Sequence, residues 1–129
     1  MNVATIASAV PDWPAPSHVR ALITERSASQ PGDPYNGFNL GNHVGDNPGR
    51  VMAHRLSLVQ QLGLEGQPRW LTQVHGARVC ELDGPGEGPV ADGSFTTRLG
   101  IACVVLSAGC GPVFLSDHKG RFVGLLHGG

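Results

Sequence analysis

The chain has 129 residues, of which 40% are apolar and 15% charged, and its formal net charge is −1 at pH 7. This length fits one domain with a hydrophobic core, and the composition lacks the charge excess and low hydrophobicity of a disordered chain. A net charge this close to zero creates no global field that would attract nucleic acid or an acidic membrane, so we expect neither as a partner.

The cysteines and the N-terminal residues indicate a compartment. The three cysteines, Cys80, Cys103 and Cys110, are odd in number and include no C-x-x-C pair, which argues against a disulfide framework and for reduced thiols. The first residues lack the basic region and the long apolar run of a signal peptide, and no window approaches the roughly 20 apolar residues of a membrane span. We predict a cytoplasmic protein in which Cys80 and Cys103 are inert core thiols.

The first part of the chain is predicted to contain little regular structure. Residues 1–17 hold three prolines and are expected to be an irregular N-terminal segment, whereas residues 19–24 alternate in the manner of a strand. Residues 25–47 follow as a long loop with several glycines. A loop of this length without an element of its own is often functional.

A helix is predicted over residues 48–62, where apolar side chains recur at helical spacing. Asn47 can act as its N-cap, and Pro48 suits the first helical position. Gly63 can end the helix in a left-handed conformation. These signals make the helix the clearest element of the sequence.

Strands are predicted to dominate the region that follows. Residues 70–74 and 77–82 form two strand pieces, separated by a His-Gly pair that begins with His75. Residues 84–89 are rich in glycine and proline and form a loop. Residues 101–107 are a near-continuous apolar run, typical of a strand that is buried on both faces.

The last elements are predicted to be a hairpin, with strands at 112–116 and 121–127 around a turn at 117–120. The chain stops at Gly129 directly after a strand, and we therefore expect the sequence to be truncated at its C-terminus. Together the elements indicate an α+β fold, with mixed or antiparallel sheets and flanking helices.

The hairpin offers a possible metal site. An even-length turn centred between His118 and Lys119 would place Cys110 opposite His127, with Cβ atoms about 4.5–5.5 Å apart on one face of the sheet. A thiolate and an imidazole at that separation could bind one zinc ion. The two residues could also be a small core hydrophobe and a strand-end histidine, because their spacing is not a local zinc signature.

Five short stretches resemble one known family. They are NLGNHVGD at 39–46, QVHG at 73–76, ADG at 91–93, AGCGP at 108–112 and HGG at 127–129. In this order and spacing they are similar to the laccase-domain or multicopper polyphenol oxidoreductase family. That family is now regarded as purine nucleoside phosphorylases and includes proteins called peptidoglycan-editing factors. The resemblance implies a layered α/β/β/α fold, of which residues 18–129 would be the N-terminal part.

The resemblance also implies an active site. The family's metal triad, carried over to this sequence, consists of His75, Cys110 and His127, which would be both the zinc ligands and the catalytic residues. Three nitrogen and sulfur ligands with an open fourth position are the arrangement of catalytic zinc. Copper is the alternative metal.

Two further residues are candidates for substrate binding. Arg55 on the predicted helix could bind phosphate in a bidentate fork, or it could be a solvated helix residue. Asn39 could line the pocket, and simple loop chemistry is the equal alternative. Asp92 is expected to have a structural role, such as capping a turn.

The sequence departs from the family pattern at several positions. Gly109 stands where the family usually has an aspartate before the cysteine, which removes a carboxylate that could orient a ligand or move a proton. His54 stands where the family has asparagine. The final stretch at 127–129 reads HGG instead of HAG, and the tryptophan and arginine that usually follow are absent.

Several functions are consistent with these features. The resemblance implies phosphorolysis of adenosine, inosine or methylthioadenosine, with purine nucleoside and phosphate as substrates, and it associates the family with adenosine deamination. A copper-dependent polyphenol oxidoreductase, as the older family name implies, is one alternative. A hydrolase with Cys110 as nucleophile is another. A truncated fragment that only binds metal is the third, and the oligomeric state is open.

Overall fold

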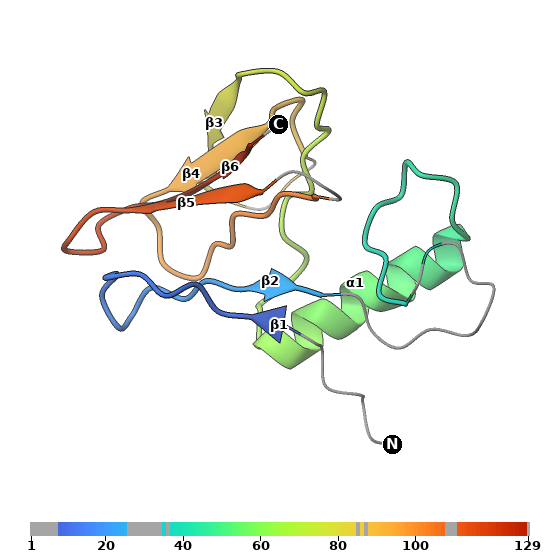
Figure 1. Cartoon of the computed structure of the whole chain (residues 1–129), viewed down its shortest axis with the longest axis horizontal. Helices are drawn as coiled ribbons and strands as arrows, with labels where there is room; N and C mark the ends of the chain where they lie inside the picture. The colour runs from blue at the N-terminus through green and yellow to red at the C-terminus, as the bar shows by residue number, and fades with distance from the viewer. Residues whose placement is uncertain are drawn as a thin grey trace. The chain divides into compact units, whose positions relative to one another are not determined.

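A computed structural model describes residues 8–25, 35, 37–84, 86, 88–107 and 111–128. The chain forms two compact units. We call one the helix unit, which comprises Met1–Pro11 and Leu22–Gln67, and the other the sheet unit, which comprises Asp12–Ala21 and Pro68–Gly129. Figure 1 labels their elements. One helix and two sheets in the described part of the chain confirm the predicted α+β class.

The helix α1 spans Pro48–Leu62, as predicted. The Asn47 side chain accepts hydrogen bonds from the backbone N–H groups of Gly49 and Arg50, at 2.9 and 3.1 Å, and so satisfies two donors that a helix leaves unpaired at its start. Within the described residues, no helix is long and apolar enough to cross a bilayer.

The C-terminal end of α1 is a Schellman motif. Gly63 adopts a left-handed conformation with φ of 68° and donates to the carbonyl of Gln60, while Leu64 donates to the carbonyl of Val59. Glycine suits this position because a side chain is strained at positive φ. The local sequence therefore determines both ends of the helix.

The buried face of α1 includes a cation. Val51, Arg55 and Leu58 are its buried residues, at the spacing of one helical face. Arg55 was expected beside the apolar stripe, but it lies within the buried row and is only 8% exposed. Its long side chain can bury its methylene groups while its guanidinium finds polar partners.

The helix unit also contains a small antiparallel pair, β1 (Ser8–Ala9) and β2 (Ile23–Thr24). The predicted strand at 19–24 is thus reduced to its last two residues. The N–H of Val19 donates to the carbonyl of Pro16 in a turn, which removes it from strand pairing. β1 lies inside the segment that was expected to be irregular, and the predicted division at residues 17 and 18 stays a prediction.

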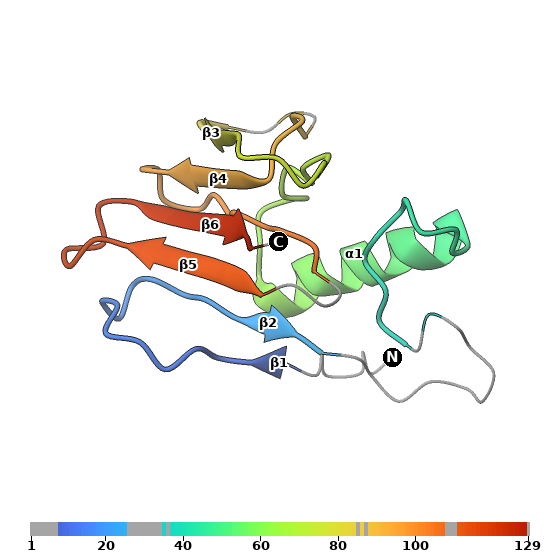
Figure 2. The ribbon, with the colours of Figure 1, turned by 45° about the horizontal axis from the view of Figure 1, so that its top comes forward.

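The sheet unit has four strands: β3 (Val79–Glu81), β4 (Gly93–Thr96), β5 (Pro112–Ser116) and β6 (Val123–His127). They lie side by side in the order β3-β4-β6-β5, as Figure 2 shows. β3 and β4 are parallel, whereas β6 is antiparallel to both β4 and β5. This mixed sheet agrees with the predicted class.

Two strand predictions in this unit were incomplete or wrong. Residues 101–107 form no strand, and all but the last of them are half-buried. The backbone N–H and carbonyl of Leu106 pair instead with the side-chain amide of Gln73, at 2.6 and 2.8 Å. β4 was not predicted, because its residues Gly-Ser-Phe-Thr follow a motif that reads as a turn. Of the predicted strand at 70–74, Thr72 alone pairs, in a parallel bridge with Val90.

The hairpin of β5 and β6 forms with a different register from the predicted one. Pro112 lies opposite His127, so the predicted direct opposition of Cys110 and His127 is wrong by two residues. The register differs because the loop between β5 and β6 is longer than predicted. In this loop the Asp117 carboxylate accepts hydrogen bonds from the backbone and side chain of Arg121. Arg121 and Phe122 therefore belong to the loop and not to the strand.

Candidate functional site

Asp92 and His127 are neighbours across the antiparallel strands β4 and β6. Gly93 pairs with Leu126, so the residues next to them, Asp92 and His127, also lie opposite each other. The N–H of His127 donates to the carbonyl of Asp92 at 2.7 Å, and Nδ1 of its ring lies 3.0 Å from Oδ2 of the Asp92 carboxylate. Both side chains are buried, with exposed fractions of 6% for His127 and 3% for Asp92.

The segment that carries His75 is held by the same carboxylate. The backbone N–H groups of Val74, His75 and Gly76 all donate to Asp92, at 2.9, 3.0 and 3.0 Å. His75 adopts a left-handed conformation with φ of 57°, which is uncommon for a residue other than glycine. Three successive donors that converge on one anion offset the strain of this conformation.

These contacts bring the two histidine rings together. The ring centroids of His75 and His127 are 5.0 Å apart, in an edge-to-face arrangement with an angle of 64° between the ring planes. His75 is exposed, so the pair lies where a solute could reach it. Two members of the predicted triad are therefore adjacent, although 52 positions separate them in the sequence.

The third member, Cys110, lies outside the described residues. Within the part of the chain that the structure describes, no group of three histidine, cysteine or acidic side chains could hold a metal ion. The histidine pair thus stands as two possible ligands, and the metal role of the triad remains a prediction.

The hydrogen bonds to Asp92 affect its charge. The N–H of Val74 contributes most to holding the pKa of the Asp92 carboxyl well below its usual range, with further contributions from Gly76, His127 and His75. Burial acts in the opposite direction but is outweighed. Asp92 is therefore ionised at neutral pH.

Gly93 allows β4 and β6 to approach closely beside this site. A Cβ atom at Gly93 would lie 2.6 Å from a methyl carbon of Leu126 and 3.2 Å from the carbonyl oxygen of Leu125. A larger residue would displace the end of the Leu126 side chain and shift the Leu125 carbonyl by a few tenths of an ångström. Because the next residue in each strand belongs to the Asp92–His127 pair, this contact also determines how that pair meets.

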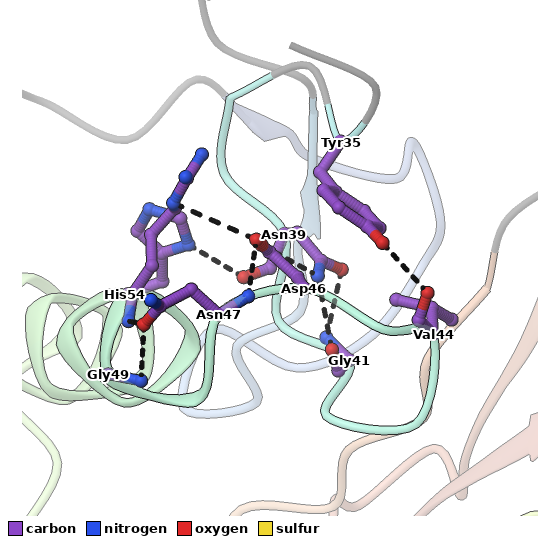
Figure 3. Close-up of polar contacts among 9 residues, drawn as sticks. Tyr35, Asn39, Gly41, Val44, Asp46, Asn47, Gly49 and His54 are labelled. Carbon is purple, nitrogen blue, oxygen red and sulfur yellow. Dashed lines mark hydrogen bonds and ion pairs between the residues drawn. The ribbon is translucent and has the colours of Figure 1, made fainter.

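A second polar cluster lies in the helix unit, between the predicted loop and the start of α1 (Figure 3). The Asn39 side chain accepts from the N–H of Gly41 and donates to the carbonyl of Gly41 and to the carboxylate of Asp46, at 3.0, 3.1 and 3.2 Å. Tyr35 donates to the carbonyl of Val44 at 3.0 Å. Asn39 thus shapes its own loop, which was one of its two predicted roles.

The loop is joined to α1 by two basic side chains. Nε of Arg55 donates to the carbonyl of Leu40 at 2.9 Å, and Nδ1 of His54 lies 2.7 Å from the carbonyl oxygen of Asn39. The ring of His54 also contacts Phe38, with centroids 5.0 Å apart. Burial lowers the pKa of the Arg55 guanidinium, which nevertheless stays charged at neutral pH.

Sequence reasoning underestimated one residue. Asp92 was expected to have a structural role such as capping a turn, and it does cap the 74–76 turn, but it also binds the ring of His127. The contact between Asp92 and His127 follows from the pairing of β4 with β6. It could not be inferred from the sequence because β4 was not predicted.

Two free thiols accompany the site in the sheet unit. Cys80 and Cys103 are half-buried and form no disulfide. Burial raises the pKa of the Cys103 thiol, which keeps it protonated and unreactive at neutral pH. This agrees with the prediction of an inert thiol at Cys103, whereas the inertness of Cys80 stays a prediction, and both cysteines are less buried than core residues.

The sequence is similar to known proteins over most of its length. Residues 20–129 match the family model described as multi-copper polyphenol oxidoreductase laccase. A purine nucleoside phosphorylase of Pseudomonas aeruginosa is 42% identical over 119 residues, which cover 92% of this chain and 48% of that protein. The Escherichia coli purine nucleoside phosphorylase YfiH is 39% identical over 121 residues, or 93% of this chain and 50% of the relative.

Two solved structures are also similar to this chain. A crystal structure of a Neisseria meningitidis protein superposes with a TM-score of 0.82 at 38% identity, and covers 95% of this chain and 50% of its own. YlmD of Geobacillus stearothermophilus gives a TM-score of 0.53 at 26% identity, over 74% of this chain and 40% of its own. The chain spans about half the length of the curated relatives it matches.

Proposed function

This chain belongs to the multi-copper polyphenol oxidoreductase laccase family, and from that membership we propose that it forms part of a zinc-type purine nucleoside phosphorylase. The names of its relatives support this activity, since proteins about 40% identical are called purine nucleoside phosphorylases. The substrates would be phosphate and a purine nucleoside such as adenosine, inosine or methylthioadenosine. Reduced thiols support the cytoplasm as its compartment.

The observation that carries the proposal is the pair of histidine rings. Two imidazoles that ligate one tetrahedral zinc ion through Zn–N bonds of about 2.0–2.1 Å have ring centroids about 5 Å apart. The centroids of His75 and His127 are 5.0 Å apart, a separation that supports the proposal that both rings ligate one zinc ion. Cys110 is the third proposed ligand, on the ground of the family resemblance alone.

The residues of the sheet unit have two proposed roles, metal binding and the orientation of a ligand. His75, Cys110 and His127 would hold the zinc and line the reaction centre. When bound, zinc would supply Lewis acidity toward an oxygen of phosphate or of water. The Asp92 carboxylate accepts from the ring of His127 and from the backbone of the turn that presents His75, so it orients the His127 imidazole and fixes the backbone at His75.

Arg55 and Asn39 are the proposed substrate contacts from the helix unit. A buried guanidinium is well suited to phosphate, because it stays charged and presents several donors in one plane. Nε of Arg55 donates to Leu40, which fixes the plane of the group. Asn39 would contribute by shaping the loop around it, through its bonds to Gly41 and Asp46.

Phosphorolysis is tested by following adenine and ribose 1-phosphate from adenosine in the presence of inorganic phosphate. We expect zinc-loaded chain to form both, and we expect His75→Ala, Cys110→Ala and His127→Ala each to lower kcat/KM at least about 100-fold. His118→Ala is the matched control, because His118 is exposed and lies in the loop between β5 and β6. Equal turnover by the three variants and the control would exclude the proposed site.

The same assay separates the other functions. Inosine formed from adenosine without phosphate would reveal adenosine deamination. Oxidation of a phenol by copper-loaded protein, in place of phosphorolysis, would favour the polyphenol oxidoreductase that the family description names. Zinc binding without any turnover would indicate a chain that only binds metal.

A further inference from the structure

We propose that Asp92 is a positioning residue that fixes His127 as the tautomer protonated on Nδ1, which leaves Nε2 as the ligating atom, and that holds the turn presenting His75. The inference deepens the proposed function and rests on it in one respect, namely that the two histidines ligate zinc.

The tautomer follows from the chemistry of the partner. An ionised carboxylate only accepts hydrogen bonds, and Oδ2 of Asp92 lies 3.0 Å from Nδ1 of His127. Nδ1 must therefore carry the proton, and in a neutral imidazole Nε2 then has a free lone pair. A carboxylate that binds the other nitrogen of a metal-ligating histidine is a recurrent arrangement in metal sites, where it also fixes the ring orientation.

The same carboxylate has little capacity left for any other partner. A carboxylate offers about four acceptor positions. The N–H groups of Val74 and Gly76 donate to Oδ1 of Asp92, while the N–H of His75 and Nδ1 of His127 share Oδ2. Asp92 therefore acts through the histidines and not by contact with a substrate, a proton in transit or a metal.

The backbone contacts of Asp92 keep the arrangement in register. Its carbonyl accepts from the N–H of His127 at 2.7 Å, and its own N–H donates to the carbonyl of Arg78 at 3.0 Å. The residue is thus fixed between the segment before β3 and the end of β6. Only 4% of it is exposed, so water competes little for these bonds.

Asp92→Asn is the sharpest test, because it keeps the shape and removes one acceptor. If the oxygen of the new side-chain amide takes the place of Oδ1, its NH₂ group faces the N–H of His75 and Nδ1 of His127. The reverse orientation would set the NH₂ group against the two N–H donors of Val74 and Gly76. The first orientation has fewer donor–donor contacts, and in it Nδ1 of His127 must become an acceptor.

Two measurements follow on the 129-residue chain. Long-range ¹H–¹⁵N spectra of the metal-free protein at neutral pH should show the Nδ1–H tautomer for His127 in the wild type and the Nε2–H tautomer in Asp92→Asn. Competition with a chelator of known affinity should show zinc bound about 10- to 100-fold more weakly by the variant. Asp117→Asn is the matched control and should change neither result, since the Asp117 carboxylate binds Arg121 in the loop between β5 and β6.

An Nε2–H tautomer in the wild type would overturn the inference, and this result does not depend on whether the variant folds. A retained Nδ1–H tautomer in Asp92→Asn, or unchanged zinc affinity, would also overturn it. Failure of the proposed phosphorylase would look different, because the tautomer switch and the loss of zinc affinity would remain in a chain that does not turn over nucleosides.

Discussion

Two buried carboxylates organise polar clusters in this chain, Asp92 in the sheet unit and Asp46 in the helix unit, and they do so over different distances in sequence. Their side chains are 3% and 2% exposed. Asp46 binds Asn39, Asn47 and Arg50, all within seven positions of it. Asp92 binds partners 16 to 18 and 35 positions away.

This difference separates a cluster that shapes a loop from one that assembles a site. The bonds of Asp46 form as soon as the chain turns from the loop into α1, because every partner is local. The bonds of Asp92 reach the 74–76 turn, 16 to 18 positions away, and its bond to His127 forms only when β4 pairs with β6. Long-range contacts of this kind carry a larger loop-closure cost. In return they bring together two imidazoles that no local segment could place side by side.

Replacement of the two carboxylates by alanine should have unequal effects, and this is the largest change that we expect. Asp92→Ala leaves the N–H groups of the 74–76 turn and Nδ1 of His127 without an acceptor inside the protein. Asp46→Ala removes fewer bonds, namely those to Asn39, Asn47 and Arg50. In thermal unfolding, the fall in Tm for Asp92→Ala should be at least about twice the fall for Asp46→Ala. Equal falls would refute the distinction between the two carboxylates.

Gly93→Ala should damage the sheet unit and its site together. The new methyl group displaces the end of the Leu126 side chain and crowds the Leu125 carbonyl, which must shift by a few tenths of an ångström. We expect a loss of about 1–3 kcal/mol in the free energy of unfolding, measured by urea denaturation, together with weaker zinc binding. Gly66→Ala is the control, because open space surrounds Gly66 and the change should stay within about 0.5 kcal/mol.

Asn47→Ala should weaken the helix unit alone. It removes the acceptor for the N–H groups of Gly49 and Arg50, which typically costs about 1 kcal/mol. Urea denaturation measures the loss, and the tautomer of His127 should not change. Asn42→Ala, at an exposed asparagine of the same loop, should be close to neutral. A similar loss in both variants would contradict the assigned cap.

The smallest expected effect concerns the loop that sets the hairpin register. The hydrogen bond from the Arg121 side chain holds the pKa of the Asp117 carboxyl below its usual range of about 3.9. A carboxyl with a depressed folded-state pKa stabilises the protein fully above its unfolded pKa, and this contribution is lost as the pH falls through the folded value. Arg121 is 74% exposed, so the gain is small.

Asp117→Asn should therefore be slightly less stable than the wild type at pH 7, and the difference should vanish in acid. Denaturation of both proteins from neutral pH down to about pH 2 provides the measurement. A difference that grows as the pH falls would have the wrong sign for this mechanism.

The contrast between local and long-range contacts also explains which features could be predicted from the sequence. The bounds of α1 were correct because Asn47 and Gly63 determine its ends through bonds to nearby residues. Residues 101–107 are as apolar as a buried strand, but the backbone of Leu106 pairs with the Gln73 side chain. No local pattern reveals a partner 33 positions away.

The site was predicted unevenly for the same reason. His75 and His127 were identified through the family resemblance, and the hairpin geometry was two residues out of register because Asp117 binds Arg121 in the loop. Asp92 was assigned a capping role, which it has, but its bond to His127 depends on the pairing of β4 with β6. Long-range pairing was the missing information in each case.

The most direct test of the central claim is a zinc titration of the metal-free chain followed by the ring resonances of its six histidines. We predict that His75 and His127 respond together and saturate at one equivalent of zinc, while His18, His43, His54 and His118 do not change. A response of His75 without His127, or saturation at other histidines first, would contradict a shared site.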